Sequence, residues 1–122
     1  PGEKIKLKEI EVEGVPAYNL YKSFHPKENG YLGFVIAVEG KRVYHAGDTE
    51  FIPEMKKIEA EIILLPVGGT YTMNAKEAAE AANTINPQVA IPMHWGSIVG
   101  TRKDAEEFKR LCKPEVIILD KE

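Results

Sequence analysis

The residues from Glu61 to Val67 limit most strongly what this chain can fold into. Their Ile-Ile-Leu-Leu core has no polar side chain at alternate positions, so the strand that they predict belongs in a sheet covered on both faces. The chain has 122 residues, of which 43% are hydrophobic and 29% charged. This length and composition predict one compact domain, 1–122.

Other apolar patterns predict the rest of the sheet. Residues 5–15 alternate as a half-buried strand does, with a slip in phase near Lys8 and Glu9. Further strands are predicted over 31–38, 42–46, 89–93 and 116–119, of which the first two form a hairpin and the last two are buried.

Three helices are predicted between the strands. The first, over 51–58, has Pro53 in its first turn, where the missing N–H is tolerated. The tetrapeptide 74–77 has a capping-box pattern and opens a helix that ends near Ile85. The third is predicted over 101–112, capped by its Thr. Strands alternating with helices indicate an α/β fold.

Charge and apolar run length exclude several classes of protein. Sixteen basic and nineteen acidic side chains give a net charge of −3, which predicts binding to neither nucleic acid nor an anionic membrane. No run approaches the ~20 apolar residues of a membrane helix, and the first residues do not have the pattern that predicts a signal peptide. The single cysteine, Cys112, cannot form an internal disulfide, which fits a cytoplasmic protein.

Two polar residues directly follow predicted strands. Asp48 stands between Gly47 and Thr49, and His94 follows Met93. Open α/β folds place ligands at the carboxyl ends of strands, and a carboxylate with an imidazole is half of a zinc or iron site. The other interpretations are an Asp that caps the next turn and a structural histidine.

The remaining polar candidates are less specific. His45 precedes Asp48 by three residues, which favours packing or support over direct ligation. The loop histidine His25 is a solvated residue or a residue of the substrate or metal site. Residues 68–71 can offer backbone N–H groups to an anion but lack the spacing and lysine of a P-loop. Cys112 is predicted to be an inert core thiol.

Four segments together resemble the C-terminal half of metallo-β-lactamase-fold hydrolases. They are similar above all to the small bacterial and archaeal members related to the ascorbate-phosphate lactonases. The resemblance implies an α/β fold, half of an αββα sandwich, with a mixed sheet and helices on one face. The segments are Val15-Pro16-Ala17-Tyr18, Tyr44-His45-Ala46-Gly47-Asp48-Thr49, Leu65-Pro66-Val67-Gly68-Gly69 and Ile91-Pro92-Met93-His94.

The resemblance also implies one or two metal ions, with Zn²⁺ as the expected metal. By this likeness Asp48 matches the metal-bridging aspartate and His94 the last metal-binding histidine. Two departures reduce the ligand set: the His-x-His-x-Asp-His motif is absent, and Asn19 stands where many relatives carry a histidine. His25 is the nearest replacement ligand. The substrate side is expected to consist of His25, Gly68, Gly69, Thr70, Tyr71 and Trp95.

Two functions therefore remain open for the chain. One is part of a metal-dependent hydrolase, in which a metal-activated water attacks an ester, lactone, phosphoester or related bond of a small molecule. On this interpretation the isolated chain is inactive. The other is a non-catalytic half-domain that associates with itself or with a partner. In both, the missing N-terminal half or a second copy of the chain is expected to cover the second face of the sheet.

Overall fold

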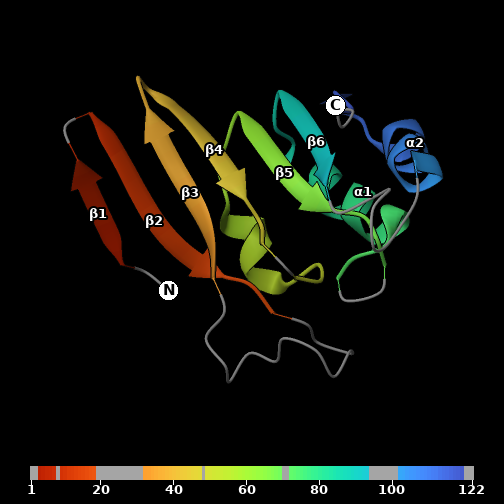
Figure 1. Ribbon diagram of the computed structural model, residues 1–122, viewed down its shortest axis with the longest axis horizontal. Helices are drawn as coiled ribbons and strands as arrows, with labels where there is room; N and C mark the ends of the chain where they lie inside the picture. The colour runs from red at the N-terminus through yellow and green to blue at the C-terminus, as the bar shows by residue number, and fades with distance from the viewer. Residues whose placement is uncertain are drawn as a thin grey trace.

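A seven-stranded sheet with its strands in sequence order forms the frame of the protein (Figure 1). The computed structural model describes residues 3–7, 9–18, 32–47, 49–69, 72–93 and 102–119. The strands are β1 (Lys4–Leu7), β2 (Ile10–Pro16), β3 (Leu32–Val38), β4 (Lys41–His45), β5 (Ile62–Pro66), β6 (Val89–Met93) and β7 (Glu115–Val116).

The sheet is mixed, and this determines where its strands end. β1 to β4 pair antiparallel, whereas β4 to β7 pair parallel. Consequently β2, β4, β5 and β6 all run in one direction, as their arrowheads show (Figure 1). The carboxyl ends of these four strands lie at one edge of the sheet.

One face of the sheet carries the helices. They are the 3₁₀ helix η2 (Pro53–Lys57), α1 (Ala75–Ile85) and α2 (Arg102–Leu111). Residues paired directly across neighbouring strands share a face. One such row is buried throughout and forms the core with the helices: Val35, Tyr44, Ile63, Ala90 and Val116. In α1, small side chains allow the helix to lie close to this face, namely Ala78, Ala81 and Ala82, each fully buried.

The opposite side of the sheet, here called the open face, is not covered by any described residue. Phe34 is 41% exposed there, and Leu64 of β5 is only half-buried. The expectation that β5 is covered on both faces is therefore met on the helix side alone. A single row on the open face is apolar across six strands: Ile5, Val12, Ile36, Val43, Ile62 and Val89.

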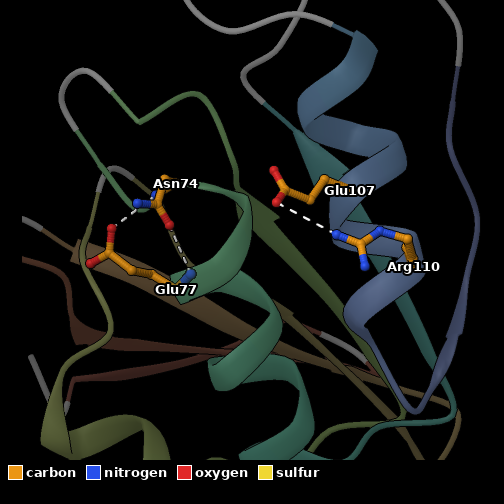
Figure 2. A network of polar contacts seen from close by, with 4 residues as sticks. All are labelled: Asn74, Glu77, Glu107 and Arg110. Atoms are coloured by element: carbon orange, nitrogen blue, oxygen red, sulfur yellow. Dashed lines mark hydrogen bonds and ion pairs between the residues drawn. The ribbon is translucent and has the colours of Figure 1, made fainter.

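The capping box at the start of α1 forms as predicted (Figure 2). The Glu77 N–H donates to Asn74 Oδ1 at 2.9 Å, and the Asn74 N–H donates to Glu77 Oε1 at 3.1 Å. Figure 2 also shows Glu107 and Arg110 of α2, whose charged atoms are 3.8 Å apart. Because both of these side chains are well exposed, their ion pair adds little stability.

The predicted hairpin of β3 and β4 and the short helix containing Pro53 are confirmed. Glu39 and Gly40 close the hairpin with φ values of 50° and 78°, as a two-residue turn between twisted strands requires. The α/β class, the mixed sheet and the helices on one face are confirmed as well. No helix among the described residues is long and apolar enough to span a membrane.

Two predicted strands differ in the structure. Residues 5–15 do not form one strand, since β1 and β2 pair antiparallel and the chain reverses between Leu7 and Ile10, where the slip in phase occurs. The predicted strand over 116–119 is reduced to β7, which pairs only with Val89 and Ala90. Beyond it, Ile117 is 41% and Leu119 58% exposed, so this segment is not buried within the described part of the protein.

We expect Asn74→Ala to lower the free energy of unfolding by about 1 kcal/mol, because it removes one side of the capping box and leaves an N–H at the start of α1 without its acceptor. Urea denaturation followed by circular dichroism measures this. Thr84→Ala is the control, since its hydroxyl only donates to the Glu80 carbonyl on the exposed side of α1, and we expect a change below about 0.5 kcal/mol. Equal effects of the two substitutions would contradict this role of the cap.

Candidate metal edge of the sheet

The candidate site is the edge where the parallel strands end, here called the carboxyl edge. Backbone hydrogen bonds extend past the strands and hold the segments together there. The Ala46 N–H donates to the Leu64 carbonyl at 3.1 Å, and the Val67 N–H donates to the Met93 carbonyl at 3.1 Å. The ends of β4, β5 and β6 are thus fixed side by side.

Most residues predicted for the site fall outside the described part of the chain. Their chain neighbours do not: Gly47 and Thr49 flank Asp48, and Met93 precedes His94. β5 lies between β4 and β6, so two strand spacings of about 4.8 Å separate the two strand ends. The predicted residues outside the described ranges are Asp48, His94, His25, Thr70, Tyr71 and Trp95, and Asn19, where many relatives carry a histidine, lies outside them as well.

Close backbone contacts determine the course of the chain before position 48. Gly47 has φ of +72°, and a Cβ there would lie 2.9 Å from the Leu32 carbonyl oxygen. At Gly33, a Cβ would lie 2.6 Å from the Ala46 carbonyl oxygen. Both positions therefore require glycine. Gly47 is needed for its positive φ and for the close approach of the Leu32 backbone, and Gly33 only for the close approach of the Ala46 backbone.

Buried polar residues gather at this edge. Among the described residues, the only buried polar or charged side chains are Thr49, Glu50 and Thr72. Thr49 and Glu50 directly follow Asp48, and the Met73 N–H donates to the Thr49 carbonyl at 3.1 Å. Sequence reasoning missed all three, because burial of a short polar loop depends on segments distant in the chain.

Tyr18 connects the end of β2 to η2. Its hydroxyl donates to Glu54 Oε1 at 2.6 Å, and burial together with this carboxylate raises the pKa of Tyr18 to about 12. The phenol therefore remains a neutral donor at working pH. Tyr44 lies in the core, where burial and the charge of Glu54 also raise its pKa.

The glycines of the predicted anion loop are only partly available. The Gly69 N–H donates to the Met73 carbonyl at 3.0 Å, and Gly68 forms a β-bridge with Asn74. The Gly69 N–H is therefore already used within the fold. This contact brings the end of β5 against the segment that precedes α1.

His45 and Cys112 have positions that fit structural roles. His45 lies on the open face between Phe34 and Leu64, and its Nδ1 accepts from the Gly47 N–H at 3.3 Å. It therefore supports the turn before Asp48. Burial raises the pKa of the Cys112 thiol to about 12, which leaves it protonated and unreactive at neutral pH.

The described residues include no cluster of three or more His, Cys, Asp or Glu side chains that could hold a metal ion. The chemistry of the two predicted ligands nevertheless fits zinc, which takes carboxylate oxygen and imidazole nitrogen. The number of predicted ligands does not fit zinc, because a catalytic zinc takes about three protein ligands. The two predicted ligands are therefore suitable donor types, but two alone are fewer than a complete zinc site takes.

The chain belongs to the family described as the Beta-lactamase superfamily domain, whose family model matches residues 1–94. It is 40% identical over 135 residues to a metal-dependent hydrolase of Methanopyrus kandleri, covering 98% of this chain and 57% of that protein. It therefore spans about half the length of the curated relatives it matches.

Two solved structures have the same fold. One, described as a metal-dependent hydrolase from Parabacteroides distasonis, matches with a TM-score of 0.85 and 35% identity over 96% of this chain and 54% of that chain. The other is a metallo hydrolase of the archaeon Ignicoccus hospitalis, with a TM-score of 0.80 and 30% identity over 98% of this chain and 55% of that chain. The sheet and helices described above are thus a metallo-β-lactamase fold in part.

We expect Gly47→Ala to destabilise the protein more than Gly40→Ala. Both positions have positive φ, but a Cβ at Gly40 meets nothing within 4 Å. Gly40→Ala measures backbone strain alone, about 1–2 kcal/mol, and Gly47→Ala adds a further ~1–3 kcal/mol for the contact with Leu32. The difference between the two urea midpoints at constant m-value measures this contact; no difference would show that the close approach is absent.

Proposed function

We propose that this chain is the C-terminal half of a metal-dependent hydrolase, in which Asp48 and His94 are ligands of one zinc site. The observation that supports this most is the carboxyl edge. Two strand ends that precede a carboxylate and an imidazole are held there only one strand apart. The buried polar residues Thr49, Glu50 and Thr72 belong to segments at the same edge, and open α/β folds bind ligands at the carboxyl ends of their strands.

Within this proposal each residue of the chain has a defined role. Asp48 bridges or orients the metal, and His94 binds it through a ring nitrogen. His25 is a further candidate ligand, since Asn19 is a poor ligand for zinc. When bound, zinc supplies a nucleophile at neutral pH by lowering the pKa of water. The proposed substrate side consists of His25, Gly68, Gly69, Thr70, Tyr71 and Trp95.

The proposed substrate is a small molecule with an ester, lactone, phosphoester or related bond. The relatives are named metal-dependent hydrolases, and each is about twice as long as this chain. We propose that the other half of such a protein supplies the remaining ligands. The isolated chain is then inactive, and the complete protein acts in the cytoplasm.

The open face supports a second sheet as the partner. Its apolar side chains extend from β1 to β6, and several are more than one-third exposed, including Leu32, Phe34 and Val38. Soluble monomers rarely expose contiguous apolar patches larger than a few hundred Å². We propose that the missing N-terminal half covers this face, since this chain covers only 57% and 54% of two of its relatives, which therefore contain additional chain. A self-associating half-domain, with a second copy on the same face, is the alternative function.

We expect the isolated chain to bind Zn²⁺ with a Kd weaker than about 1 µM, because half of a ligand set provides roughly half of the 10–16 kcal/mol of a structural zinc site. Isothermal titration calorimetry measures this. Asp48→Ala and His94→Ala should each abolish binding, whereas Asp104→Ala in α2 should not. A nanomolar site with one zinc per chain would show that a ligand has been missed, with His25 the first candidate. Binding unaffected by Asp48→Ala would contradict the proposed site.

We also expect the chain at micromolar concentration to self-associate or to bind a hydrophobic dye, because its open face lacks a cover. Phe34→Glu should weaken both, since it places a charge on that face. Lys56→Glu is the control, because Lys56 is exposed on η2, on the helix side. Analytical ultracentrifugation and dye fluorescence provide the readouts. A stable monomer that binds no dye would contradict an apolar docking face.

A further inference from the structure

A pocket of about 230 Å³ lies between η2 and the strands β2, β3 and β4, on the side of the sheet opposite the open face. It is here called the η2 pocket. Its volume is below the ~300–1,000 Å³ of sites for drug-sized ligands, so it suits a smaller molecule. Four of its lining residues are buried and four are charged: Val15, Val35, Tyr44 and Met55, and Glu13, Arg42, Glu54 and Lys57.

The register of the sheet places opposite charges on two sides of an apolar centre. Glu13 of β2 pairs with Val35 of β3, and Val35 pairs with Tyr44 of β4, so the three share the helix side. Arg42 stands two residues before Tyr44 in β4 and therefore faces the same side. The η2 pocket thus has a carboxylate on the β2 side and a guanidinium on the β4 side, with Val35 between them.

The Tyr44 hydroxyl is a buried polar group for which no described residue provides a hydrogen-bond partner. Tyr44 is only 1% exposed. Burial and the charge of Glu54 raise its pKa, so the phenol keeps its proton and acts as a donor. Buried polar groups in native proteins almost always have a partner. Because Tyr44 lines the η2 pocket, a molecule bound there can supply the missing acceptor.

Three charged groups of the pocket are also available to a ligand. The Arg42 N–H donates to Glu61 Oε2 at 2.6 Å, and the Arg42 Nε donates to the Glu59 carbonyl at 2.7 Å. These contacts hold the guanidinium in place and leave its two Nη groups without a partner in the described part of the chain. Within the same ranges, the Lys57 ammonium and the Glu13 carboxylate form no hydrogen bond or ion pair.

We propose that the η2 pocket binds a small ω-amino acid, a zwitterion with its carboxylate and ammonium groups at the two ends of a short apolar chain. The ligand carboxylate pairs with the planar Nη fork of Arg42 and accepts from the Tyr44 hydroxyl. The apolar chain lies over Val35, and the ammonium group pairs with Glu13. Lys57 adds a second positive charge to the pocket. This inference involves no metal ligand and does not rest on the proposed function.

Four related molecules test which groups the pocket recognises. Pentanoate lacks the ammonium group of 5-aminopentanoate, and pentylamine lacks the carboxylate. The isomer 2-aminopentanoate carries both groups on the same carbon, so it cannot reach both sides of Val35. By isothermal titration calorimetry we expect 5-aminopentanoate to bind with a Kd below about 1 mM and the other three at least about tenfold more weakly.

Conservative variants locate the binding within the pocket. Arg42→Gln, Tyr44→Phe and Glu13→Gln should each weaken binding of 5-aminopentanoate by about tenfold. Glu13→Gln should also remove the preference over pentanoate, because the variant no longer presents a charge to the ammonium group. Glu11→Gln is the matched control, since Glu11 faces the same side of β2 but does not line the pocket, and it should leave the affinity unchanged.

Two further measurements keep the test independent of folding. Circular dichroism verifies that each variant is folded at the temperature of the titration, and if Tyr44→Phe is not, Glu13→Gln and Arg42→Gln carry the comparison. In NMR spectra, 5-aminopentanoate should shift the amide signals of Val35 and Met55, whereas those of α2 should stay in place.

Several results would overturn the inference. Absence of binding at about 10 mM 5-aminopentanoate would show that the pocket is not a site for this class of molecule. Equal affinity for pentanoate or for 2-aminopentanoate would show that charges at two separate ends are not recognised. An affinity unaffected by both Glu13→Gln and Arg42→Gln would place the ligand outside the η2 pocket.

Discussion

The parallel pairing of β5 with both of its neighbours is the constraint on which the rest of the structure depends. It aligns the ends of β4, β5 and β6 at one edge, so that Ala46 and Met93 lie on either side of the end of β5 although they are 47 positions apart in sequence. The apolar residues Ile63 and Leu65 of β5 are fully buried under the helices. The same strand thus provides both part of the core and the geometry of the candidate site.

This arrangement also explains why the chain has two different surfaces. Pleating alternates the side chains of each strand between the helix side and the open face. Since β5 is apolar at every position from Ile62 to Leu65, it requires a cover on both sides, and the described residues provide only one. The open face fits the length of the chain, which corresponds to about half of its curated relatives.

Much of the fold could be predicted from local patterns because local interactions determine those elements. The capping box at Asn74 and the hairpin turn at Glu39 each involve residues close in sequence. The reversal between Leu7 and Ile10 was harder to predict, because the sequence there has no typical turn residue and the alternation continues beyond it. At the other end of the sheet, residues 117–119 look like a strand, but the ladder with β6 ends before them.

The candidate site was only partly predictable for a similar reason. Asp48 and His94 could be proposed because each follows a strand, and the structure fixes their chain neighbours at one edge. The hydrogen bond between the Tyr18 N–H and the Thr49 hydroxyl could not be predicted, since it joins residues 31 positions apart. No local pattern indicates which threonine hydroxyl will pair with the backbone of a distant strand end.

The central claim is that Asp48 and His94 bind the same metal ion. A crystal structure of the chain grown with Zn²⁺, with anomalous data at the zinc edge, tests it most directly. The account predicts one zinc peak about 2.0–2.2 Å from both an Asp48 carboxylate oxygen and a His94 ring nitrogen. Side chains more than about 8 Å apart, well beyond a shared ligand shell, or zinc bound by other residues would contradict it.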